Sequence, residues 1–309
     1  MILVTGSAGH LGEGLIRTLR AAARPCVGLD RVASPFTDIV GSIVEPAVVE
    51  RAMAGCDQVI HAATLHKPHV ATHGRQAFVD TNVTGTLNLL EAAVRANVRA
   101  FIFTSTTSVF GDALVPPPGA PAAWITEQVV PVAKNIYGVT KLAAEELCAL
   151  AHRNQGLACL VLRTSRFFPE ADDDPQARAT YDDANLKATE FLYRRVDVED
   201  AVEAHLVALD RAAAIGFGRF IITATTPFVR DDAADLRRDP EEVLTRRVPG
   251  WRDAYRALGW KLLPSFDRVY DNLHARARLG WKPRHDFASV LARGDVRSPL
   301  ARAIGMKGY

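Results

Sequence analysis

The chain opens with a strand-like run that leads directly into three glycines spaced three residues apart. Residues 1–5 read MILVT, and Gly6, Gly9 and Gly12 follow ahead of an apolar helical pattern. Such a turn lets backbone amides approach an anion, and the helix dipole favours negative charge at the same point. The spacing also lets the third glycine pack the helix against a sheet. We therefore predict a binding site for the pyrophosphate of a dinucleotide. The alternative is a turn in which the glycines serve packing alone.

Short apolar runs alternate with helical patterns over the first half of the chain. The runs lie at 1–5, 26–30, 58–63, 100–105 and 159–163, and the helical patterns at 11–23, 46–54, 75–97 and 136–153. Strands without polar alternation are buried on both faces, which is typical of a parallel sheet covered by helices. We predict an α/β fold with a doubly wound parallel sheet (Rossmann fold). Residues 6, 30, 63 and 105 then fall at the edge where a ligand crevice opens.

The pattern changes after residue 165. The segment that follows is polar and acidic, with at most one short helix expected; a helix over about 200–213 and a strand at 219–224 come next, and the remainder mixes Pro, Arg, Asp and Trp. We predict a nucleotide-binding domain and a smaller, α-rich C-terminal substrate-binding lobe. The predicted domain comprises 1–165 and about 194–225, and the predicted lobe comprises 166–193 and 226–309. The proline-rich segment 116–123 is predicted to be a stiff loop.

Composition excludes several classes of protein. The 309 residues are 48% hydrophobic, and 37 Lys and Arg stand against 35 Asp and Glu without forming a basic stripe, so no nucleic-acid partner is expected. No apolar run approaches the roughly 18 residues of a membrane span, and no leader pattern is seen, so we expect a cytoplasmic protein without a membrane partner. Four widely spaced cysteines, Cys26, Cys56, Cys148 and Cys159, are expected to be free thiols.

A carboxylate ends the second predicted strand. Asp30 lies about eighteen residues beyond Gly12, where it can accept hydrogen bonds from the ribose hydroxyls of an adenosine. It would repel a 2′-phosphate, so NAD is predicted in preference to NADP. Arg31 weakens this preference because a guanidinium can stack on adenine or hold that phosphate. An aspartate at a strand end is also a common turn cap, which is the alternative interpretation.

A tyrosine and a lysine share one face of the helix predicted over 136–153. Tyr137 and Lys141, in YGVTK, lie four residues apart. A phenol has a pKa of about 10, and an ammonium one turn away favours the phenolate. The pair can then act as general acid and base at an alcohol carbon that loses hydride. Thr106, just beyond the strand at 100–105, can hydrogen-bond the reacting oxygen. Each feature alone is common, and the prediction rests on their combination.

Several motifs, in this order, resemble one known family. They are T-G-x-x-G-x-x-G at 5–12, Asp30, VIHAAT at 59–64, NVTGTLNLLEAA at 82–93, STTSVFG at 105–111 and YGVTK at 137–141. Together they are similar to the extended short-chain dehydrogenase/reductases of the NAD-dependent epimerase/dehydratase group. The resemblance covers residues 1–165 and resumes in RRVDVEDAVEAHLVAL at 194–209.

The resemblance implies a role for each matching residue. Tyr137 would be the catalytic acid and base, Lys141 would lower the Tyr137 pKa and bind the nicotinamide ribose, and Thr106 would be the hydroxyl partner. Thr107 and Arg166 would contact the substrate. The remaining cofactor contacts implied are Gly6, Gly9, His10, Leu11, Gly12, Asp30, Arg31, Ser42, Ile43, Ala62, Ala63, Thr64, His66, Asn82, Thr104 and Ser165. Members of this group commonly dimerise through helices that match 75–97 and 136–153, so a homodimer is expected.

Four departures from the family pattern bear on function, and one of them is at Arg166. Ser42 stands where the family has an aspartate near adenine, and its hydroxyl can replace that contact more weakly. The run 105–107 is Ser-Thr-Thr and lacks the carboxylic acids of sugar-nucleotide 4,6-dehydratases, so water elimination is not expected. Only about 37 residues separate Arg163 from Asp200, which is short for a cap that encloses a nucleotide sugar, so a smaller substrate stays open.

Arg166 replaces an asparagine of the family beside the substrate. A guanidinium there can hold a phosphate or a carboxylate with two hydrogen bonds, which indicates an anionic substrate. The alternative is an ion pair with the nearby acidic run, which comprises Asp172, Asp173 and Asp174.

Three histidines, His66, His69 and His73, have spacings of three and four residues. No cysteine or carboxylate completes a set of ligands, so no metal is predicted. His66 is predicted to contact cofactor or substrate, and an ordinary loop histidine is the alternative.

These features predict NAD-dependent hydride transfer at a secondary alcohol or ketone carbon. The leading hypothesis is an epimerase that acts on a sugar or sugar nucleotide, so the expected partner is a small carbohydrate. The alternative is a net NAD(P)-dependent dehydrogenase or ketoreductase with a smaller, anionic substrate. A more remote alternative is a non-catalytic dinucleotide sensor, although such proteins tend to lose the tyrosine or the lysine.

Overall fold

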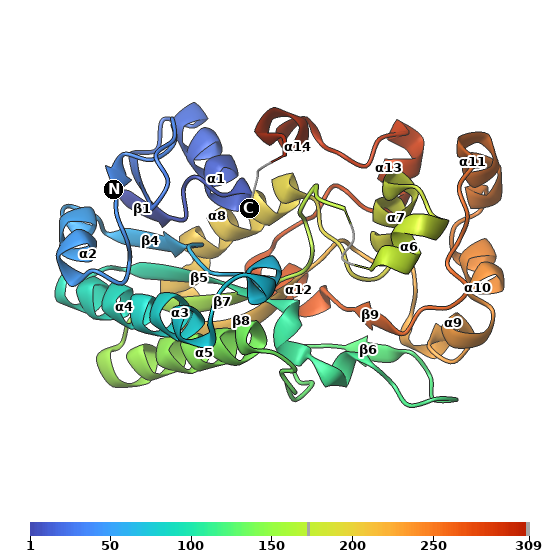
Figure 1. Ribbon diagram of the computed structural model, residues 1–309, viewed down its shortest axis with the longest axis horizontal. Coiled ribbons are helices and arrows are strands. Elements are labelled where there is room, and N and C mark those ends of the chain that lie inside the picture. Colours follow the sequence, from blue (N-terminus) through green and yellow to red (C-terminus); the bar gives the residue numbers. More distant parts are fainter. Residues whose placement is uncertain (172–173, 307–309) are drawn as a thin grey trace.

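A parallel sheet of seven strands organises the computed structural model, which describes residues 1–171 and 174–306 (Figure 1). The strand order is β3-β2-β1-β4-β5-β7-β8. The strands are β1 (Ile2–Thr5), β2 (Cys26–Asp30), β3 (Ile39–Val40), β4 (Gln58–His61), β5 (Ala100–Thr106), β7 (Cys159–Thr164) and β8 (Phe217–Ile222). From β1 the chain adds β2 and β3 on one side and then returns to add β4 on the other side. This switch in strand order places a ligand crevice at the carboxyl ends of β1 and β4. The predicted doubly wound fold is confirmed.

Helices cover both faces of this sheet (Figure 1). On one face lie α1 (His10–Ala21) and α8 (Val198–Ile215), and on the other lie α2 (Pro46–Met53), α4 (Gly85–Arg95) and α5 (Ile136–Gln155). Adjacent strand residues point to opposite faces: Val4 packs in the α1 and α8 core, and Leu3 packs in the core of the other face. Both faces are therefore apolar, which explains the absence of polar alternation in the strands.

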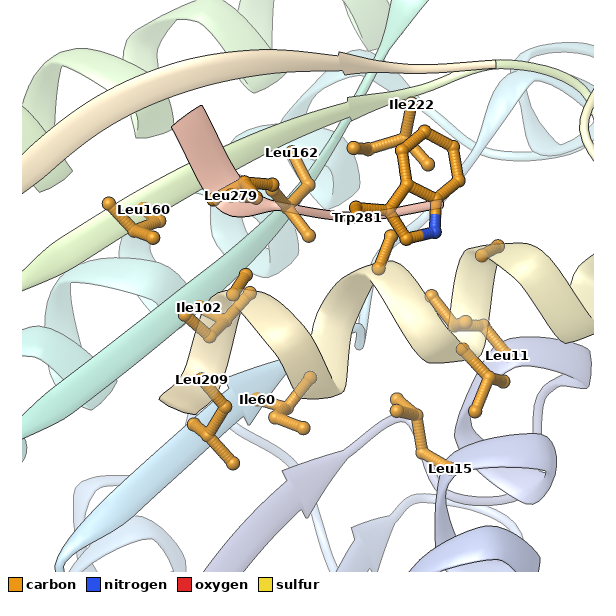
Figure 2. Close-up of a cluster of buried hydrophobic side chains, with 14 of the residues drawn as sticks. Leu11, Leu15, Ile60, Ile102, Leu160, Leu162, Leu209, Ile222, Leu279 and Trp281 are labelled. Atoms are coloured by element: carbon orange, nitrogen blue, oxygen red, sulfur yellow. The ribbon is translucent and has the colours of Figure 1, made fainter. Parts of the chain in front are cut away.

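The C-terminal part of the chain returns to complete the core on the α1 and α8 face (Figure 2). The indole of Trp281, which follows α12 (Leu273–Leu279), is 1% exposed and lies beside Leu162 and Ile222, in the cluster that also contains Leu11. Its Nε1 donates a hydrogen bond of 3.2 Å to the carbonyl of Asp200. The last described helix, α14 (Pro299–Ile304), also contacts α1 and α8.

A smaller lobe with its own apolar core packs beyond the carboxyl ends of the strands (Figure 1). It contains α6 (Pro175–Thr180), α7 (Asp183–Glu190), α9 (Asp235–Arg238), α10 (Pro240–Arg247), α11 (Trp251–Leu258), α13 (Phe287–Arg293), and a two-stranded parallel sheet of β6 (Ala123–Ile125) and β9 (Arg268–Tyr270). Residues 123–125 lie in the range predicted for the nucleotide-binding domain, yet they pair with the lobe because β9 offers an edge to a short apolar run.

The helix predicted over 75–97 has an irregular start. It comprises α3 (Arg75–Phe78), the π-helical η2 (Val79–Thr84) and α4. A π turn holds one extra residue and is frequent at functional sites. Here it contains Asn82, which is 2% exposed. The short 3₁₀ turns are η1 (Lys67–Ala71), η3 (Thr107–Phe110), η4 (Asp112–Leu114) and η5 (Arg230–Asp232).

Two further expectations concern the chain as a whole. All four cysteines are free thiols, as predicted, and three of them are buried. Within residues 1–171 and 174–306, no helix is long and apolar enough to cross a membrane.

Trp281→Ala should lower the free energy of unfolding by about 3–5 kcal/mol, because it removes a fully buried indole and leaves a cavity against the sheet. Urea unfolding followed by circular dichroism measures this change. Leu273→Ala is the control, since Leu273 is 61% exposed at the start of the same helix that precedes the tryptophan, and it should change stability by no more than about 0.5 kcal/mol. Equal effects of the two changes would contradict the proposed anchoring by Trp281.

Candidate active site

A cavity of about 1060 Å³ opens at the carboxyl ends of the central strands. Gly6, Asp30, Ala63 and Ser105 all border it, as the topology predicts. The structure brings the following predicted site residues to its wall: Gly6, Gly9, His10, Leu11, Gly12, Asp30, Arg31, Ser42, Ile43, Ala62, Ala63, Thr64, His66, Thr104, Thr106, Thr107, Tyr137, Ser165 and Arg166. It does not bring Asn82 and Lys141 there; both are buried behind the wall.

The glycine turn packs tightly against the loop that follows β4. Gly6 has a φ of +75°, which side chains rarely adopt, and a Cβ placed there would lie 2.7 Å from the Ala63 nitrogen. A Cβ on Gly12 would lie 1.9 Å from the Gly6 carbonyl oxygen. These two glycines are therefore required for packing whether or not an anion binds. Gly9 precedes the first turn of α1 and has no side chain to obstruct the amides of that turn.

Asp30 both caps the glycine turn and faces the cavity. Its Oδ2 accepts a hydrogen bond of 3.0 Å from the Ala8 amide, and its Oδ1 accepts one of 2.9 Å from the Val32 amide. The capping role is thus present, and each carboxylate oxygen keeps a second lone pair for a ribose hydroxyl. Arg31 and Ser42 border the same end of the cavity.

The far end of the cavity presents a buried hydroxyl. Ser165 follows β7, is 2% exposed, and its Oγ has no hydrogen-bond partner among the described residues. A buried polar atom without a partner is costly, so this oxygen is suited to a polar ligand group. The glycine turn, the Asp30 carboxylate and this hydroxyl lie along one cavity, and these residues fit a dinucleotide such as NAD.

Tyr137 and Thr106 lie together in the wall between these ends. Tyr137 is in the first turn of α5, which begins where the Asn135 side chain accepts a hydrogen bond from the Gly138 amide. Burial raises the pKa of the Tyr137 phenol to about 12, although the neighbouring Thr106 hydroxyl lowers it. The phenol is therefore protonated in the protein without ligand and presents a hydrogen-bond donor to the cavity.

Lys141 lies behind the cavity wall, one helical turn after Tyr137. Its ammonium Nζ donates a hydrogen bond of 2.6 Å to the Thr104 carbonyl and lies 4.0 Å from the centre of the Phe103 ring. Burial lowers the Lys141 pKa to about 7, and Glu145 one turn further along α5 offsets part of this. The sequence predicted that the lysine lowers the tyrosine pKa; without ligand the opposing effect of burial prevails at both groups, because both have lost contact with water.

Asn82 lies behind the cavity wall and forms hydrogen bonds with residues of that wall. Its Oδ1 accepts hydrogen bonds of 2.9 Å from both the Thr64 hydroxyl and the Leu65 amide. Its Nδ2 donates to the Leu65 carbonyl and, at 3.1 Å, to the Thr140 hydroxyl of α5. Asn82 therefore shapes the loop after β4 and does not itself reach the cavity.

His10 and His66 contact the segment after β7 across the cavity. The His66 ring stacks on Phe168 with ring centroids 5.4 Å apart, and His10 Nε2 lies 3.3 Å from Glu170 Oε1. Burial, followed by the nearby imidazoles, lowers the His66 pKa to about 3, so this ring is neutral. His69 contacts His66 by its ring edge. Within the described residues no group of three or more His, Cys, Asp or Glu could hold a metal ion.

Arg166 belongs to a cluster of arginines around a buried carboxylate. Its Nη1 lies 3.8 Å from Oε1 of Glu190, which also pairs with Arg194 at 2.8 Å, while Arg195 pairs with Oε2 at 2.7 Å. Burial raises the Glu190 pKa, but the three arginines outweigh it and hold that pKa below its usual value. Of the acidic run that the alternative interpretation invoked, Asp172 and Asp173 lie outside the described residues.

Sequence reasoning missed the residues that the lobe and the segment after β7 contribute. Arg268 and Tyr270 of β9 border the cavity, as do Arg194, Phe167, Phe168 and Glu170. The alternation in Arg-Val-Tyr places the first and third side chains on one side of a strand, which is the signal that could have identified the first two.

Known proteins resemble this chain in sequence and in fold. The model of the NAD dependent epimerase/dehydratase family matches residues 2–222. UDP-glucose 4-epimerase of Azospirillum brasilense is 26% identical over 99% of this chain and 94% of that protein. dTDP-glucose 4,6-dehydratase of Streptomyces antibioticus is 29% identical over 94% of this chain and 90% of that protein. The fold matches a short-chain dehydrogenase/reductase superfamily protein of Agrobacterium tumefaciens with bound NAD, at 24% identity, 95% coverage of both chains and a TM-score of 0.69.

The parallel sheet, the glycine turn and the tyrosine with its lysine define an enzyme of the extended short-chain dehydrogenase/reductase class. The chain belongs to the NAD-dependent epimerase/dehydratase family, as its motifs predicted.

Lys141→Met should change how stability depends on pH. Between pH 7.5 and 9 the unfolded chain carries a proton on Lys141 that the folded protein lacks, so the lowered pKa makes wild-type stability rise with pH relative to the variant. The difference in unfolding free energy should grow by about 2 kcal/mol over this range, at about 1.36 kcal/mol per pH unit. Urea titrations at both pH values measure it. The buried thiols titrate in both proteins, so their contributions to the difference cancel. Parallel curves of unfolding free energy against pH would contradict the lowered Lys141 pKa.

Proposed function

We propose that this enzyme is an epimerase that moves hydride at a secondary alcohol carbon of a sugar nucleotide. The observation that carries the proposal is the buried Tyr137 phenol, beside Thr106, in the same cavity as the glycine turn and Ser165. When bound, NAD supplies the hydride acceptor and a positive charge near the phenol. The names of the relatives with UDP- and dTDP-sugar substrates support the sugar-nucleotide class.

Side chains of the protein would accept and donate the proton of the substrate hydroxyl. Thr106 holds the substrate oxygen by a hydrogen bond, and Tyr137 exchanges the proton of that oxygen. Because burial keeps the free phenol protonated, Tyr137 begins as a donor, and it becomes a base only when positive charge enters the cavity and lowers its pKa. Lys141 is placed one helical turn behind it, held by the Thr104 carbonyl, to provide part of that charge.

The end of β5 separates this proposal from a dehydratase. Water elimination needs an acid and a base beside the substrate, and the residues at this position are Ser105, Thr106 and Thr107, none of which is carboxylic. The alternative of a net dehydrogenase uses the same reacting groups and differs in the release of reduced cofactor. Arg166 and Arg194 at the cavity wall favour an anionic substrate in either case.

Incubation of the enzyme and NAD with sugar nucleotides, free uronic acids and small hydroxy-ketones tests the proposal. We expect conversion of a sugar nucleotide to an isomer, seen by chromatography, without net gain in absorbance of reduced cofactor. Accumulation of reduced cofactor would instead identify a dehydrogenase, and a response confined to free acids would contradict the sugar-nucleotide substrate. Tyr137→Phe should lower turnover by about 10²–10⁴-fold while NAD still binds.

Tyr255→Phe is the matched control. Tyr255 is also buried, and burial also raises its pKa to about 12, but it lies in the lobe, where its hydroxyl is 2.9 Å from that of Thr189. This change should leave turnover within a factor of about two. Full activity in Tyr137→Phe would contradict the assigned chemistry.

We also propose that the enzyme is a homodimer through α4 and α5. Both helices expose apolar side chains on their outer surfaces: Leu87 is 39% exposed, Val139 50% and Leu150 40%. Apolar residues that lie on adjacent helices and face away from the core are typical of subunit interfaces.

Leu87→Glu should convert the dimer to a monomer, because it would bury a charge in the apolar interface. Light scattering after size-exclusion chromatography measures the mass. Val130→Glu is the control, since Val130 is 76% exposed and lies outside both helices. A wild-type mass of one chain would refute the dimer.

A further inference from the structure

A row of polar side chains crosses the interior beneath the cavity. Thr5 ends β1, His61 ends β4 and Thr86 lies in the first turn of α4, and each is at most 1% exposed. The His61 Nδ1 lies 2.8 Å from the Thr5 hydroxyl, and its Nε2 lies 2.9 Å from the Thr86 hydroxyl. The rings of Phe101 and Phe103 enclose the imidazole, with centroids 6.1 and 5.5 Å away.

Neighbouring groups set the direction of every hydrogen bond in this row. The Thr86 hydroxyl donates to the Asn82 carbonyl at 2.7 Å, so its oxygen accepts the bond from His61 Nε2–H. Nδ1 is then an acceptor, and the Thr5 hydroxyl donates to it. The Thr5 oxygen in turn accepts a bond of 3.2 Å from the Ala63 amide. His61 is therefore a neutral imidazole in one tautomer, and burial, followed by the charge of Lys141, holds its pKa well below 6.5.

This row connects the two backbone segments that form the cofactor side of the cavity. Thr5 immediately precedes Gly6, and Ala63 is the residue whose nitrogen a Cβ on Gly6 would strike. On the other side of the imidazole, Asn82 ties the loop after β4 to α5 through Thr140. The bonds thus run without a break from the glycine turn to the helix that carries the reacting tyrosine.

We propose that His61 is a positioning residue for cofactor binding, whose neutral imidazole holds the glycine turn and the loop after β4 at the spacing that NAD requires. A hydrophobic residue could fill the same volume but could not join the two hydroxyls. The inference depends on the NAD dependence of the family and not on the identity of the substrate.

His61→Leu and Thr86→Val both interrupt the row, and Thr86→Val does so at nearly constant volume. NAD affinity, measured by isothermal titration calorimetry, should fall at least tenfold in each. Val59→Ala is the control for stability: Val59 is on the same strand, is fully buried and packs into the core of the α2 and α4 face. It should lower the melting temperature while NAD affinity stays within twofold of wild type. If His61→Leu does not fold, Thr86→Val alone carries the test.

Two further measurements distinguish positioning from stability alone. The double variant Thr5→Val, Thr86→Val should lose no more NAD affinity than the worse single variant, because the row acts as a unit. Imidazole ¹⁵N resonances should report a neutral Nε2–H tautomer for His61 at pH 7. NAD affinity within twofold of wild type in variants that melt at lower temperature would overturn the proposal, as would a protonated or Nδ1–H imidazole.

Discussion

The candidate site depends on one close backbone approach, between the turn that follows β1 and the loop that follows β4. Gly6 and Gly12 lack the Cβ atoms that would collide with Ala63 and with Gly6 itself, so the two strand ends meet without side chains between them. The first turn of α1 then borders the cavity. The bonds of Thr5 and His61 lie directly beneath this contact and reinforce it with polar groups that have no access to water. The proposed cofactor site would therefore use the same glycines that packing requires, so the two interpretations of the motif are compatible.

Loss of water determines the charge state of the reacting pair before any ligand binds. The phenol of Tyr137 and the ammonium of Lys141 are both buried, and burial favours the neutral form of each. In such a low-dielectric setting a single added charge has a larger effect than it would in water. Under the proposed function, ligand binding rather than the resting protein would set the acid–base chemistry of this pair.

The sheet and its helices were predictable because each is specified by local pattern. Residues 26–30 match β2, and all five predicted strands of the first half lie in the sheet. The two-residue β3 and the three-residue β6 and β9 are too short to have a periodicity, and their pairing depends on segments far apart in the chain. The same limit applies to the site. Gly6 and Asp30 follow from motif and strand position, whereas the contact of His66 with Phe168 requires knowledge of how loops cross. Asn82 shows the converse: its motif was found, but it lies in a π turn behind the wall, and its side chain bonds the loop after β4 instead of reaching the cavity.

The pairing of β6 with β9 has a consequence for motion. The strand β6 continues from β5 through the turns η3 and η4, so the lobe is joined to the central sheet by a strand contributed from the catalytic side as well as by Trp281 and α12. Several covalent and packed connections of this kind resist rotation of the lobe as a rigid body about a single hinge.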